Sequence, residues 1–180
     1  MAREIVVIGG SPSGRSRSGF VAKEIGDGLA REGWAVRTFG IGDFAAEDVF
    51  WGRAEAPAIA KYLEAVKGAA GIVLATPVYK ATYTGALKAI VDLIPQDALI
   101  GKAALGIATA RQEAHGREAD RAYQSLFAFF RARAVGSLVV LDEELRLEAE
   151  AGTFTDPARA RVAEASKAFR AALDASDPAR

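Results

Sequence analysis

The stretch that decides the fold is Ile5-Val6-Val7-Ile8-Gly9-Gly10-Ser11-Pro12-Ser13-Gly14-Arg15-Ser16-Arg17-Ser18, where an aliphatic run leads directly into a loop of glycines, hydroxyls and arginines. α/β proteins build phosphate sites from a short buried strand that enters such a loop just before a helix. Glycines let the backbone approach a ligand, and three of the serine hydroxyls and the amides at the helix start can donate to phosphate oxygens. The alternative is an ordinary strand-to-helix connection in which Ser16 or Ser18 caps the helix.

The loop resembles two nucleotide-binding motifs without matching either. Gly9 and Gly14, followed by Arg15 and Ser16, have the spacing of a P-loop, but arginine replaces the lysine and Pro12 removes a backbone N–H. The apolar run 71–75 continues into a threonine, where a magnesium-binding aspartate would be needed. The dinucleotide motif G-x-G-x-x-G is also absent. A nucleoside triphosphatase or kinase is therefore a minor alternative.

Composition narrows the class of protein. The 180 residues are 51% hydrophobic, which suits one domain over residues 1–180 with a sizeable core. The 23 basic and 23 acidic residues balance, so nothing indicates a nucleic-acid or acidic-membrane partner. There is no cysteine and only one histidine, which disfavours thiolate catalysis, a metal site and a serine–histidine triad. No apolar run reaches the ~20 residues of a membrane span, so we expect a cytoplasmic protein.

Apolar runs alternate with helical patterns along the chain. The expected strands are 5–9, 35–39, 71–75, 102–109 and 135–141, and the expected helices are 18–32, 57–67, 85–94, 113–133 and 157–175. The segment 40–56 has no regular pattern, but its aromatic residues make it too apolar for a free linker. This alternation predicts an α/β fold with a five-stranded parallel sheet, in the order 2-1-3-4-5, and helices on both faces.

That topology also predicts where a ligand binds. In such sheets the site lies beyond the carboxyl ends of the strands where the strand order reverses, here between strands one and three. The loop Ser11–Ser18 is therefore expected beside Thr76–Tyr83, with Thr109-Ala110-Arg111 flanking both.

The second of these loops carries the more specific signal. It reads Ala75-Thr76-Pro77-Val78-Tyr79-Lys80-Ala81-Thr82-Tyr83-Thr84-Gly85-Ala86-Leu87-Lys88, with Asp92 four residues further on. Together with Gly10-Ser11-Pro12 and Ser16-Arg17-Ser18, it resembles the NADPH-dependent FMN reductases of the flavodoxin-like superfamily. The closest likeness is to the reductase components of alkanesulfonate and methanesulfonate monooxygenase systems. The resemblance covers roughly Ile5 to Leu141 and implies a three-layer flavodoxin-like fold that uses FMN and NADPH.

The resemblance also implies which residues hold the flavin. Residues of the first loop would bind the FMN phosphate: Ser11, Ser16, Arg17 and Ser18. Residues of the second loop would lie at the isoalloxazine ring: Thr76, Pro77, Val78 and Tyr79. Tyr83 would be an aromatic wall or only a plug at a helix start, and Lys80 would face the NADPH phosphates. Hydride transfer between NADPH and FMN needs no protein acid or base, so no catalytic residue is named.

One departure from the family lies after the fourth strand. The family commonly has Thr-Gly-Gly there, whereas this chain has Thr109-Ala110-Arg111. Alanine replaces glycine only where φ is negative or the turn shifts. Thr109 and Arg111 are still assigned to cofactor binding, Arg111 to the flavin or to the second nucleotide. His115 is expected to be a structural hydrogen-bonding residue.

Two kinds of function are compatible with these patterns. The first is an NADPH-dependent FMN reductase that supplies reduced flavin to a partner monooxygenase, or that passes electrons to a quinone, an azo dye or a metal oxyanion. The second is a flavodoxin-like electron carrier, although the balanced charge lacks the acidic bias of such carriers. An apolar stripe in the expected helix 113–133 predicts a homo-oligomer, a dimer or a tetramer, with core packing as the alternative: Leu126, Phe127, Phe129 and Phe130.

Overall fold

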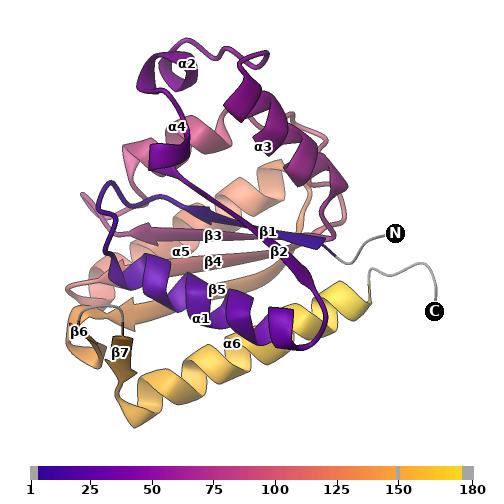
Figure 1. Ribbon diagram of the computed structural model, residues 1–180. Coiled ribbons are helices and arrows are strands. Elements are labelled where there is room, and N and C mark those ends of the chain that lie inside the picture. Colours follow the sequence, from indigo (N-terminus) through magenta and orange to yellow (C-terminus); the bar gives the residue numbers. More distant parts are fainter. Residues whose placement is uncertain (1–3, 149–150, 176–180) are drawn as a thin grey trace.

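The computed structural model describes residues 4–148 and 151–175, and these residues surround a five-stranded parallel sheet (Figure 1). The strand order is β2-β1-β3-β4-β5, as predicted. The strands are β1 (Glu4–Gly9), β2 (Ala35–Gly40), β3 (Gly71–Pro77), β4 (Ala103–Ala110) and β5 (Arg133–Leu141). β3 and β4 are almost wholly buried, which explains why both are continuous apolar runs.

Helices cover both faces of the sheet (Figure 1). The residues buried on one face come from α1 (Arg17–Arg31) and α6 (Asp156–Asp174). Those on the other face come from α3 (Pro57–Gly68), α4 (Gly85–Val91) and α5 (Glu113–Phe129). Among the described residues, no helix is long and apolar enough to cross a membrane.

α5 ends earlier than its sequence pattern predicts. Phe129 is its last residue, and Arg131 then adopts a left-handed conformation with a φ of 51° that turns the chain into β5. Phe127 and Phe130 are buried in the core, whereas Phe129 is 58% exposed. Core packing therefore accounts for most of the apolar stripe, and Phe129 is the member that faces outward.

Two further segments depart from expectation. The segment 40–56 forms a short 3₁₀ turn and α2 (Ala46–Phe50), which rise above the sheet (Figure 1). Phe44 is buried there, but Phe50 and Trp51 are exposed and pack edge-to-face on each other. The second segment is an unpredicted antiparallel hairpin after β5, formed by β6 (Leu145–Glu148) and β7 (Ala151–Phe154).

Glu144 fastens the start of this hairpin to the rest of the fold. Its carboxylate accepts the N–H of Leu141 at 2.8 Å and pairs with Arg161 of α6 at 2.6 Å. Partial burial alone raises the pKa of Glu144, but the hydrogen bonds and the positive charge of Arg161 outweigh it, so the pKa lies below its ordinary value.

We predict that Glu144→Gln destabilises the fold in a pH-dependent way. Because the pKa of Glu144 is lower in the folded chain than in the unfolded one, its stabilisation is present above the ordinary value of 4.5 and is lost as the pH falls through the folded pKa. Urea unfolding should show a loss of about 1–3 kcal/mol at pH 7 that shrinks under acid. Glu143→Gln, at an exposed neighbour, is the control. A pH-independent loss would contradict this.

Candidate functional site

Three loops meet at the carboxyl edge of the sheet, as the topology predicts (Figure 1). The N–H of Gly10, after β1, donates to the carbonyl of Ala75 in β3 at 2.7 Å. The N–H of Val78, after β3, donates to the carbonyl of Thr109 in β4 at 2.8 Å. These two bonds hold the three loop bases side by side.

The first loop, Ser11–Ser18, is organised by its own hydroxyl groups. Ser11 Oγ accepts the N–H of Ser13 at 3.1 Å, and Ser13 Oγ donates to the carbonyl of Arg15 at 2.9 Å. Ser16 is the N-cap of α1, where its Oγ accepts the N–H of Gly19 at 3.0 Å. The capping role and the phosphate-binding role are compatible, because a hydroxyl that accepts this bond still has its hydrogen to donate.

Several donors of this loop remain open toward a ligand. Within the described residues, the backbone N–H groups of Arg17 and Ser18 have no acceptor, as is usual for the first turn of a helix. Ser18 itself is buried, and its Oγ lies 3.5 Å from Ser16 Oγ. Two amides and two hydroxyls therefore gather at the start of α1.

Arg17 has a structural partner that the sequence did not reveal. Its Nε donates to the carbonyl of Leu145 at 3.0 Å, and its Nη1 lies 3.9 Å from Asp142 Oδ1. The side chain is 41% exposed. The guanidinium therefore joins the first loop to the hairpin β6–β7.

The second loop, Thr76–Tyr83, has a fixed start and an open tip. The Pro77–Val78 peptide is held on both sides, since Thr76 Oγ1 donates to the carbonyl of Pro77 at 2.9 Å and the N–H of Val78 binds Thr109. At the tip, Tyr79 and Thr82 exchange two backbone hydrogen bonds around a tight turn.

The turn itself is strained. Its central residues, Lys80 and Ala81, have φ values of 53° and 67°, which only glycine, asparagine and aspartate adopt readily. Within the described residues, neither the N–H of Lys80 nor that of Ala81 has an acceptor. The strain therefore accompanies two backbone donors that are open at the edge of the sheet.

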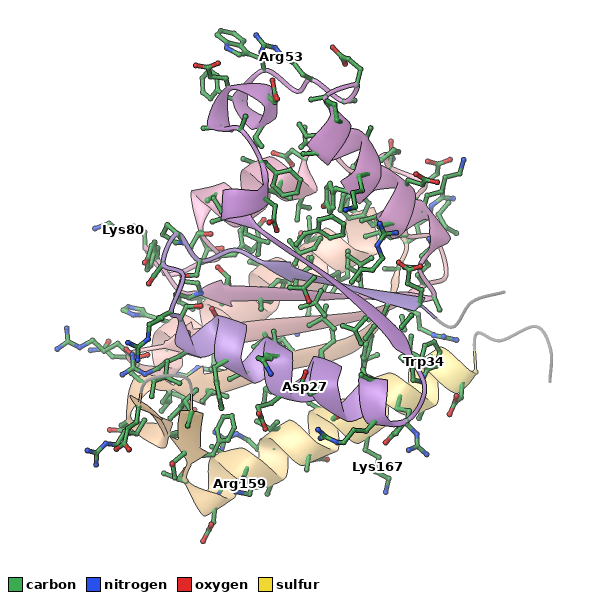
Figure 2. All side chains as sticks on the ribbon, viewed as in Figure 1. Asp27, Trp34, Arg53, Lys80, Arg159 and Lys167 are labelled. Atoms are coloured by element: carbon green, nitrogen blue, oxygen red, sulfur yellow. The ribbon has the colours of Figure 1, made fainter. Side chains whose placement is uncertain are left out.

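The aromatic and charged side chains of this loop differ in exposure. Tyr79 is half exposed. Tyr83 is partly buried, with its ring 5.9 Å from that of Tyr123, so the interpretation of Tyr83 as a plug fits at least as well as that of a wall. Lys80 points away from the sheet edge (Figure 2).

The third loop accommodates its unusual alanine without strain. Ala110 is the last residue of β4 and is not among the residues with positive φ, so its Cβ is tolerated. Thr109 is buried and holds Val78 through its carbonyl, whereas Arg111 is exposed. His115 is exposed on α5, and within the described ranges its side chain forms no hydrogen bond, so the expected structural role is not seen.

A cavity of about 810 Å³ borders the first loop, and it differs from the predicted ring site. Gly14, Arg15 and Ser16 line one end, and the cavity follows α1 toward β2. No residue of Thr76–Tyr83 lines it. A flat ring beside the second loop would therefore lie at the open sheet edge and not inside this cavity.

Comparisons by family model, by sequence and by structure all lead to FMN reductases or oxidoreductases. Residues 3–145 match the family model described as NADPH-dependent FMN reductase. The chain is 36% identical over 163 residues to an FMN reductase (NADPH) of Pseudomonas putida, covering 91% of this chain and 76% of that protein. It is 36% identical over 142 residues to the FMN reductase (NADPH) of Escherichia coli, covering 77% and 73%. A solved structure of an NADH:FMN oxidoreductase (EMOB) in its apo form has a TM-score of 0.88 and 31% identity, covering 99% of this chain and 93% of that one.

Proposed function

This chain belongs to the NADPH-dependent FMN reductase family, and we propose that the loops after β1, β3 and β4 form its FMN site. The enzyme transfers hydride from NADPH to FMN. The observation that supports the site is the set of donors at one sheet edge that have no partner among the described residues: the amides of Arg17 and Ser18 in the first loop, and those of Lys80 and Ala81 in the second.

The first loop suits the phosphate end of FMN. Amides at a helix start and serine hydroxyls are the donors that a phosphate dianion accepts from best. Ser16 and Ser18 supply hydroxyls, Ser11 shapes the loop, and Arg17 adds positive charge. The second loop suits the ring, because Pro77, Val78 and Tyr79 form a rigid strip beside the open amides.

The protein contributes position and electrostatics to the reaction. FMN supplies the hydride-accepting ring when it is bound. The fixed Pro77–Val78 peptide sets the plane of the strip, and the exposed face of Tyr79 leaves room for a second flat ring to stack.

We predict that Arg17→Ala raises the Kd of FMN at least tenfold, because a charge-assisted bond worth roughly 1.5–3 kcal/mol is lost. The Kd of riboflavin, which has no phosphate, should change less than twofold in a fluorescence titration. Asp142→Asn is the matched control, since it removes the carboxylate near Arg17 and should leave FMN binding intact or tighter. Equal weakening of FMN and riboflavin would show that Arg17 only supports the hairpin.

We propose that Arg111 and Lys80 bind the phosphates of NADPH. Each lies two residues from the bond between Val78 N–H and the Thr109 carbonyl, and both are exposed. Neither forms an ion pair within residues 4–148 and 151–175, although many other arginines and lysines do. NADPH differs from NADH by one phosphate, so unpaired cations here favour NADPH.

We therefore expect Arg111→Ala and Lys80→Ala each to raise the KM for NADPH several-fold in steady-state assays. The KM for NADH should change little, because NADH lacks the additional phosphate. Lys61→Ala, at an exposed lysine of α3, serves as the control. If the KM values for NADPH and NADH rose by the same factor, Lys80 and Arg111 would not distinguish NADPH from NADH.

Reduced FMN is proposed to leave the enzyme for a flavin-dependent monooxygenase. Pro12–Arg15 and Tyr79 are exposed. The proposed site therefore binds the flavin at the surface of the protein, from which it can dissociate. The chain also has equal numbers of acidic and basic residues, which gives no support to an acidic docking face of a one-electron carrier.

Release can be tested by mixing the protein anaerobically with NADPH and a large molar excess of FMN. An enzyme that releases its product should bleach the absorbance of the whole flavin pool, and an added monooxygenase should then form product once oxygen is admitted. Bleaching that stops at one flavin per chain would instead support a carrier with tightly bound FMN.

A further inference from the structure

Thr84 lies at the point where the two flavin-binding loops and α4 come together. Its side chain is only 2% exposed, and it is the N-cap of α4. Thr84 Oγ1 donates to the carbonyl of Gly10 at 2.6 Å and accepts the N–H of Leu87 at 3.0 Å. One hydroxyl thus binds the base of the first loop and the first turn of the helix that follows the second loop.

Thr76 extends this contact to the second loop. The N–H of Thr84 donates to Thr76 Oγ1 at 3.0 Å, and Thr76 Oγ1 donates to the carbonyl of Pro77 at 2.9 Å. Thr76 is also fully buried. A continuous chain of hydrogen bonds therefore runs from Gly10 through Thr84 and Thr76 to Pro77.

This chain of bonds joins the two ends of the proposed FMN site. Gly10 lies at the root of the loop that suits the phosphate, and Pro77 begins the strip that suits the ring. A ligand that spans both subsites gains fully from each only when their separation lies within the reach of the chain that joins its two ends. Hydroxyls that fix the separation would favour the ligand that fills both subsites over one that fills only the ring subsite.

We infer that Thr84 is a positioning residue that sets the distance between the phosphate subsite and the ring subsite, with Thr76 as its relay. The inference rests on the proposed FMN site. It requires the hydroxyl and not merely the shape of the side chain, because only a hydroxyl donates to Gly10 and accepts from Leu87 at once. Thr84→Val keeps the shape and removes both bonds, whereas Thr84→Ser keeps both.

The test compares the Kd values of FMN and riboflavin for the full-length protein by fluorescence titration. The preference of the wild type for FMN over riboflavin should fall at least fivefold in Thr84→Val. It should stay within twofold of the wild type in Thr84→Ser and in Thr153→Val, an exposed site on β7. Thr76→Val breaks the relay without removing the Thr84 cap, so it should lower the preference even if Thr84→Val fails to fold.

The outcomes separate this inference from the proposed site. If the folded Thr84 and Thr76 variants bind FMN and riboflavin more weakly by the same factor, or bind both as the wild type does, the positioning role is wrong while the site stands. If Thr84→Ser does not restore the preference, the hydroxyl is not the cause and the inference also fails. If the wild type itself binds riboflavin as tightly as FMN, the phosphate subsite is wrong and the inference falls with it.

Discussion

The close approach of Gly10 to α4 is the constraint on which the site depends. A Cβ on Gly10 would lie 2.4 Å from the Cβ of Leu87, a separation that no side chain can accept. Because the position is glycine, its peptide reaches β3 on one side and the buried Thr84 hydroxyl on the other. The strand order brings the first and second loops to the same edge of the sheet. The contact of Gly10 with α4 and Thr84 then fixes the distance between the two loops.

Most of the architecture could be predicted from the sequence because its strands are distinct apolar runs separated by helical patterns. β3 and β4, buried on both faces, give the strongest pattern. The sequence does not reveal the hairpin β6–β7, because four-residue strands give too little alternation to recognise. The aromatic pattern of α5 continues past Phe129, so the sequence predicts too long a helix. The turn depends on the left-handed conformation of Arg131, which an arginine in the sequence does not indicate.

The meeting of the three loops could be predicted, but the partners of their side chains could not. The loops follow strand ends, so their meeting depends on topology alone. The contact between Arg17 and Leu145 joins residues 128 positions apart. Leu145 belongs to the hairpin β6–β7, which the sequence does not reveal. The sequence does not distinguish Thr84 from an ordinary helix cap, because its second bond, to Gly10, depends on the packing of residues far apart in the chain.

The site combines a rigid base with an open rim, and the two properties serve different parts of one reaction. Buried hydroxyls and strand-end amides hold the loop bases, where a shift would disturb the alignment that hydride transfer needs. The Lys80–Ala81 turn and the Pro12–Arg15 segment lie at the surface, where few contacts would have to break for a flavin to depart. Burying the rim would tighten flavin binding but slow product release, which sets the rate of many enzymes. If the flavin leaves as the product, as we propose, this arrangement places the rigidity beneath the ligand and not over it.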